Sequence, residues 1–359
     1  MSESKSPPKI RLTLSPQAER YARSDAPREA RLMAARGALP LPPIELATVL
    51  FVLHHDADPE IKELARTSLE SLPDALCDAV LTGPAHPALI SHLAHAFRDK
   101  PDRLEKIALN SATDDSTIAF LAGLSCSSVV DIVSNNQERM LRAPEIVDAL
   151  GNNPLTGRAV IDRIFSFLGI KGTEAKGGGD ASDDISDADA EAALRAILGD
   201  EMGQFARKLI EETDDAQEDD GSDSSLYALV QKMSVFQKIK LARMGNKEAR
   251  GLLVRDRNKI VALAAITSPK VTDSEAISMA QSRNVGDDVL RFISNNREWT
   301  KNYQVKLALA MNPKCPQPAA MKFINYLQDR DLRVMMRSKD VPAAISSHAR
   351  RILAKKGKI

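Results

Sequence analysis

The sequence predicts an all-α protein in which pairs of short helices repeat along the chain as an α-solenoid. One pattern occurs twice in near-constant register: Asn135-Asn136 returns as Asn295-Asn296 after 160 positions, and Asn153-Pro154 returns as Asn312-Pro313 after 159. Hydrophobic residues make up 43% of the chain but aromatic residues only 4%, which favours close helix packing through small aliphatic side chains. No run alternates between apolar and polar residues for the length of a strand.

Regularly spaced start and stop signals predict helices of roughly 8–14 residues. Ser15-Pro16 and Asp58-Pro59 each place a capping side chain before a proline at the first helical position. Gly37 and Gly245 follow apolar-periodic runs, where a helix-ending glycine is expected. Four further residues are candidate N-caps: Thr113, Thr272, Asn302 and Asp331.

The charges divide the chain into regions, although they sum to zero over all 359 residues. Residues 1–14 lack an apolar signal core and are expected to form a disordered tail. An N-terminal helical-repeat domain is expected over 15–170. A second, basic helical-repeat domain is expected over 225–359, where 26 Lys and Arg against 10 Asp and Glu give a net charge of +16.

Residues 171–224 are acidic, with 17 Asp and Glu against 5 Lys and Arg. Gly, Ser and Asp are dense at both ends of this segment, so we expect an acidic flexible linker. Inside it, apolar residues recur at spacings of three and four, which predicts an amphipathic helix near 188–212. The stripe consists of Leu194, Leu198, Met202, Phe205 and Leu209. The pattern leaves open whether this helix is a spacer or docks on a solenoid.

Two segments resemble known helical repeats. Asp58-Pro59-Glu60-Ile61-Lys62 resembles the run that opens the second helix of HEAT-type repeats, where Asp-Pro precedes Val or Ile and then Arg or Lys. Asn312-Pro313-Lys314-Cys315-Pro316 resembles the start of the leucine-rich repeat variant, with Cys315 where that family carries Thr. Asn153-Pro154-Leu155-Thr156-Gly157 is its counterpart in the first half. From Lys238 to Leu353 the chain also resembles segments of bacterial proteins with no assigned function.

The resemblance implies an armadillo-type fold with an extended concave surface for a large partner. The best-characterised relatives of the variant repeat hold an iron–sulfur centre on an N-terminal Cys cluster. Cys77, Cys126 and Cys315 are far apart in this sequence, so the resemblance carries no cofactor over.

Candidate catalytic and metal-binding residues are few. His92 and His95 are spaced i, i+3 and share a helix face, a spacing that suits metal chelation. His54-His55 ends an apolar run and Asp58 fits an N-cap, so packing and capping are the favoured interpretation and no metal site is expected. Cys126 has no His near it in the sequence, and no catalytic residue is assigned.

The basic half carries the candidate partner-binding residues. Residues 238–259 hold eight Lys and Arg against only Glu248 and Asp256, and farther on cations interleave with the chain's only Trp. The candidates are Lys240, Arg243, Lys247, Arg250, Arg255, Arg257, Arg297, Trp299, Lys301 and Tyr303. Arg243, Arg250 and Trp299 are expected to be the anchors, because Arg and Trp dominate binding energy at interfaces. The alternative is a solvated face of cations, with Trp299 anchoring a joint between helices.

These observations favour a non-enzymatic cytoplasmic scaffold that does not span a membrane and binds a protein partner with an acidic surface. One alternative is a nucleic-acid-binding HEAT-like protein that uses the basic half. Another is an enzyme on a HEAT scaffold, which needs a cleft that gathers Glu, His or Cys. We also expect the linker at 171–224 to mask the basic surface until a stronger anionic partner displaces it.

Overall fold

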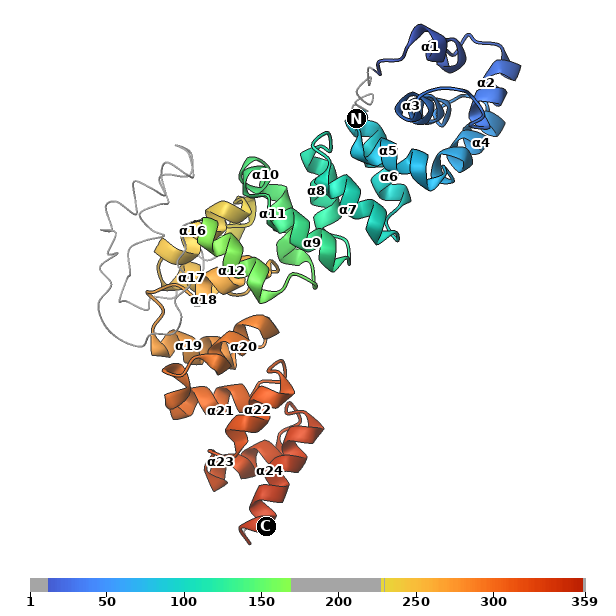
Figure 1. Cartoon of the computed structure of the whole chain (residues 1–359). Helices are drawn as coiled ribbons and strands as arrows, with labels where there is room; N and C mark the ends of the chain where they lie inside the picture. Colours follow the sequence, from blue (N-terminus) through green and yellow to red (C-terminus); the bar gives the residue numbers. More distant parts are fainter. Residues whose placement is uncertain (1–11, 169–226, 229, 358–359) are drawn as a thin grey trace, which may run out of the picture. The chain divides into compact units, whose positions relative to one another are not determined.

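The computed structural model describes residues 12–168, 227–228 and 230–357, and the regular secondary structure in these ranges is entirely helical. Short helices that are adjacent in the sequence pack in a repeating manner (Figure 1). The predicted all-α solenoid is therefore confirmed. Within the same ranges, no helix combines the length and the apolar character that a bilayer crossing requires.

The chain divides into two compact units, residues 1–160 and 161–359. The division falls inside α12 (Arg158–Phe167), and the expected domain limits of 15–170 and 225–359 stay predictions. The acidic linker at 171–224, its expected helix near 188–212 and residues 1–11 of the expected tail lie outside the described residues.

The first unit is built from two rows of helices. Their bounds are α1 Pro16–Ala22, α2 Arg28–Ala35, α3 Pro43–Leu53, α4 Pro59–Glu70, α5 Asp74–Thr82, α6 Pro87–Ala96, α7 Pro101–Leu109, α8 Asp115–Ala122, α9 Ser127–Ser134, α10 Gln137–Arg142 and α11 Pro144–Asn152. In one row α1, α3, α5, α7 and α9 pack one after another. In the other, α2 packs on α4, α6 on α8 and α8 on α11. Fully buried aliphatic residues such as Leu50, Leu89 and Leu150 fill the space between the rows.

The second unit repeats this arrangement. Its helices are α16 Val235–Met244, α17 Lys247–Leu253, α18 Lys259–Ile266, α19 Asp273–Gln281, α20 Asp287–Asn295, the 3₁₀ turn η1 Trp299–Lys301, α21 Tyr303–Met311, α22 Gln317–Ile324, α23 Asp329–Arg337 and α24 Ala343–Lys355. Helices two apart in order pack together: α16 packs on α18 and α18 on α20, while α17 packs on α19 and α19 on α21. In the α18 helix, every residue from Ile260 to Ile266 is buried.

Most of the predicted helix signals act as expected. The Ser15 hydroxyl accepts a hydrogen bond from the Ala18 amide at 3.3 Å, and the Asp58 carboxylate accepts one from the Glu60 amide at 3.0 Å. Gly245 ends α16, and Gly37 follows α2 with a φ of 73°, a conformation that only glycine adopts easily. Thr272 and Asn302 are the N-caps of α19 and α21.

Two predicted N-caps are wrong. Asp114, not Thr113, caps α8, because the Thr113 hydroxyl is occupied by a hydrogen bond to the Ile107 carbonyl at 2.6 Å. Asp331 lies in the first turn of α23, whose N-cap residue is Gln328. In both cases the side chain that was predicted to cap the helix does not bond to the free amides at the helix start.

A buried asparagine joins successive repeats. The Asn153 amide donates to the carbonyls of Ala122 and Leu124, both at 2.7 Å, and its oxygen accepts from the Leu155 amide at 2.9 Å. Asn110 and Asn312 make the equivalent three bonds in their own repeats. The Asn-Pro motif is therefore a clamp on the end of the preceding repeat, a structural role.

The Asn-Asn motif is also structural, but only through its second residue. Asn136 caps α10 by accepting from the Arg139 amide at 3.1 Å, and Asn296 accepts from the Glu298 amide at 3.0 Å at the start of η1. Asn135 and Asn295 are exposed. The duplicated pattern thus marks the same turn in each unit, as expected from side chains that hydrogen-bond to nearby backbone groups.

Candidate functional site

The ten candidate partner-binding residues lie at two places in the second unit. Six come from α16, α17 and the turns that follow α17 (Figure 1): Lys240, Arg243, Lys247, Arg250, Arg255 and Arg257. The other four lie between α20 and the start of α21: Arg297, Trp299, Lys301 and Tyr303.

Arg250 is buried, with 1% of the residue exposed, so the prediction that it anchors a partner is wrong. Its guanidinium Nη2 lies 2.9 Å from a Glu275 carboxylate oxygen, and its Nη1 donates to the Gly245 carbonyl at 2.8 Å. The second Glu275 oxygen accepts from the Thr272 amide at 2.8 Å. Arg250 therefore joins the end of α16 to the start of α19 and has a structural role.

Four of the remaining cations of the first group are exposed and unpaired. Among the described residues, no carboxylate lies within ion-pair distance of Lys240, Lys247, Arg255 or Arg257. Nearby cations differ from them. Lys238 pairs with Asp256 at 2.8 Å, Arg243 is half-buried, and burial lowers the pKa of Lys259, although Asp288 and Asp287 oppose that shift.

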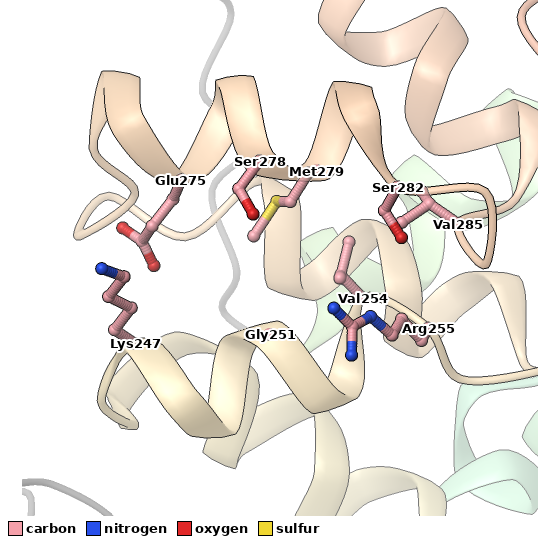
Figure 2. Close-up of a pocket in the computed structure, with 9 residues that line it drawn as sticks. All are labelled: Lys247, Gly251, Val254, Arg255, Glu275, Ser278, Met279, Ser282 and Val285. Carbon is pink, nitrogen blue, oxygen red and sulfur yellow. The ribbon is translucent and has the colours of Figure 1, made fainter. Parts of the chain in front are cut away.

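Two of the exposed cations flank a small notch between α17 and α19, with a volume of about 80 Å³. Figure 2 shows Lys247 at one end, reaching toward Glu275, and Arg255 at the other end beside Val254. Gly251 lies between the two cations on the α17 side. The α19 side carries Ser278, Met279 and Ser282. The notch thus offers two positive charges and two hydroxyl groups around a partly apolar wall.

Gly251, Ser278 and Met279 were missed in the sequence, where only the cations of this region were singled out. Gly251 could have been noticed in the sequence, because a glycine inside a helix costs stability relative to alanine. Its presence there despite this cost indicates that the missing side chain has a role. The two α19 residues carried no signal, because their proximity to α17 is a tertiary contact.

The second group of candidate residues, between α20 and the start of α21, contains fewer unpaired cations than the first group. Trp299 is half-buried and packs edge-on against Phe292, with ring centroids 6.1 Å apart. Lys301 pairs with Glu298 at 2.7 Å. The Tyr303 hydroxyl donates to the Asp331 carboxylate and accepts from the Gln328 amide, and burial raises its pKa. Arg297 is exposed.

The first unit contains a larger cleft of about 680 Å³ between α7, α9 and α10. Leu109, 71% exposed, and Ile132 give it apolar surface, and Asn135 and Gln137 give it amides. Arg139 also lines it, but its guanidinium is occupied by the Thr113 carbonyl at 2.7 Å. The cleft presents no arrangement of Glu, His or Cys of the kind that the enzyme alternative requires.

The histidines pack against aromatic rings. His92 lies 4.8 Å from the His54 ring and 5.5 Å from the Phe51 ring, while His95 packs on Phe120 at 3.9 Å. His92 and His95 therefore do not converge on one point. Burial, reinforced by repulsion from His54, lowers the pKa of His92 to about 4. Across the described part of the chain, no three His, Cys, Asp or Glu side chains are placed to hold a metal ion.

The comparisons with known proteins return no relative. No family model, no curated protein and no solved structure matches the chain.

Proposed function

We propose that the chain is a non-enzymatic helical-repeat scaffold that binds an acidic segment of a partner protein on its second unit. The observation that carries this proposal is the set of exposed, unpaired cations on consecutive elements: Lys240, Lys247, Arg255 and Arg257. Such charges attract anionic partners and speed their association. The fold supports the proposal, since stacked helix pairs provide an extended surface rather than an enclosed site.

The surroundings of these cations favour a polypeptide over a nucleic acid. No aromatic side chain lines the notch between Lys247 and Arg255, so a base would have no stacking partner there. Trp299, the chain's only Trp, is already packed against Phe292. A carboxylate needs only charge and hydrogen-bond donors, which Lys, Arg and Ser side chains supply.

The proposal places the chain in the cytoplasm, because Cys77, Cys126 and Cys315 are free thiols and such thiols are typical of reducing compartments. It also keeps the masking hypothesis. The acidic segment at 171–224 lies outside the described residues, and deleting it should raise the affinity of the chain for heparin at low salt.

The test is fluorescence anisotropy of a labelled decaglutamate peptide titrated with the full chain. Substituting Lys240, Arg255 and Arg257 together by Glu should weaken binding by about tenfold or more, because each substitution replaces attraction by repulsion. The matched control reverses three exposed cations of the first unit, Arg20, Arg36 and Lys62, and changes the net charge equally. Equal losses in the two variants would mean that only net charge matters.

A labelled DNA duplex serves as the second probe. A plot of log affinity against log salt with a slope near −5 or steeper would mean that about six phosphates are neutralised, and would favour the nucleic-acid alternative. We expect a shallower slope for DNA and tighter binding of decaglutamate at matched salt.

A further inference from the structure

We infer that the notch between α17 and α19 is a receptor for one glutamate side chain of the acidic partner segment. This inference rests on the proposed function and adds to it the place where the partner is anchored. It joins three observations: an opening at a helical glycine, two unpaired cations at its ends, and a buried carboxylate that is already neutralised.

The opening exists because residue 251 is a glycine. A Cβ built on Gly251 meets no heavy atom within 4 Å, so packing does not require a glycine at this position. Its backbone is α-helical, a conformation that any residue adopts. A glycine inside a helix costs about 1 kcal/mol relative to alanine. What the glycine does provide is room between Lys247 and Arg255, in a notch of about 80 Å³ (Figure 2).

The charge in the notch is unbalanced toward the positive. Glu275 is the only carboxylate that lines it, and both of its oxygens are engaged, one by Arg250 and the other by the Thr272 amide. Lys247 and Arg255 remain without an ion-pair partner among the described residues. A carboxylate placed between them would gain two charge-assisted contacts.

The other residues that line the notch determine which aliphatic part of a bound side chain can lie beside them. Met279 and Val254 offer apolar surface, and Ser278 and Ser282 offer hydroxyl donors. The two methylene groups of a glutamate match the apolar part, and its head group matches the donors and cations. A volume of about 80 Å³ admits the end of one side chain, so this is an anchor point within a longer contact.

The test fills the notch without changing its charge. Gly251→Leu in the full chain should weaken binding of labelled decaglutamate by about tenfold, the loss expected for one charge-assisted contact. Gly251→Ala should weaken it less and should melt at or above the wild-type temperature, which keeps the test valid if the leucine variant does not fold. Gln304→Leu adds a leucine at an exposed position of α21 and should bind as the wild type does.

The outcomes separate the inference from the proposed function. Wild-type affinity in Gly251→Leu, together with weak binding after charge reversal at Lys240 and Arg257, would overturn the notch and leave the acidic-partner proposal standing. No binding of decaglutamate either by the wild type or by the variant that lacks residues 171–224 would overturn both. An equal loss of DNA binding and decaglutamate binding in Gly251→Leu would overturn the assignment of the notch to a glutamate side chain.

Discussion

Arg250 and Glu275 form a buried ion pair across 25 residues of sequence, with Nη2 2.9 Å from Oε1 and side chains that are 1% and 4% exposed. Glu275 also completes the capping box of α19 with Thr272. One carboxylate thus starts α19 and holds the arginine that reaches the end of α16. This cross-link sets the position of α17 beside α19, and with it the walls of the notch.

Removing one member of this pair should destabilise the second unit. Arg250→Met leaves a buried carboxylate without its cation, which costs about 3–5 kcal/mol. Urea unfolding followed by the fluorescence of Trp299 measures the change, since that residue is the only Trp. The matched control is Arg283→Met, because the Arg283–Asp340 pair is more than half exposed and should contribute less than about 1 kcal/mol. Similar losses in both variants would contradict the structural role of Arg250.

The asparagine clamp should depend on the donor group of its amide. Asn312→Asp keeps the shape of the side chain but cannot donate to the carbonyls of Ala280 and Ser282, which lie 2.7 and 3.0 Å away. We expect a loss of about 2–4 kcal/mol from two unmet carbonyls, measured by the same Trp299 fluorescence. Asn295→Asp, at the exposed first position of the Asn-Asn motif, should change stability little. A stable Asn312→Asp variant would show that the clamp is dispensable.

Cys315 occupies the position at which the equivalent repeats carry a threonine. The Thr113 hydroxyl bonds to the Ile107 carbonyl and the Thr156 hydroxyl to the Leu150 carbonyl, each six residues earlier and at 2.6 Å. Cys315→Thr should form the same bond to the Leu309 carbonyl and stabilise the second unit by about 1 kcal/mol. A lower midpoint of urea unfolding in this variant would mean that the pocket around Cys315 is too tight for a hydroxyl.

The first unit should lose stability in mild acid. The pKa of His92 is about 4 when folded, chiefly through burial, against about 6.5 when unfolded. The unfolded chain therefore binds more protons between these values, so the free energy of unfolding falls as the pH drops from about 6.5 toward 4. His54, His55, His95 and Arg66 are the charged groups that add to the shift.

The substitution His92→Phe should remove part of this pH dependence. Urea unfolding followed by circular dichroism between pH 7 and pH 5 measures it, in a range above the ordinary pKa values of Asp and Glu. The wild type should lose stability over this range and the variant should lose less. Parallel pH curves for the two proteins would contradict the role assigned to the buried histidine.

Local signals in the sequence predicted the fold well because they act over a few residues. A capping side chain such as Ser15 or Asn302 bonds to an amide two or three positions ahead, so its role can be read from its neighbours. Thr113 shows where this fails: two oxygen-bearing residues adjoin the helix start, and only the fold decides that Thr113 turns back to Ile107.

The candidate site was less predictable because it depends on contacts between helices. In the sequence, the cations of residues 238–259 form one cluster. In the structure, Arg250 is not available to a partner because it pairs with Glu275, and a count of charges along the sequence does not show that Glu275 lies close to it. Lys247 and Arg255 stay exposed, and the notch between them is half formed by α19. Thr272 was predicted as an N-cap, but neither its capping box with Glu275 nor the arginine that shares the Glu275 carboxylate was predicted.

The most direct test of the account is to locate a bound acidic peptide on the full chain by zero-length carbodiimide cross-linking and mass spectrometry. This chemistry joins a lysine amine only to a carboxylate in contact with it. With biotinylated decaglutamate, we predict cross-links at Lys247 and Lys240, with Lys247 reduced in Gly251→Leu. Cross-links concentrated at Lys62 and Lys100 of the first unit would contradict the account.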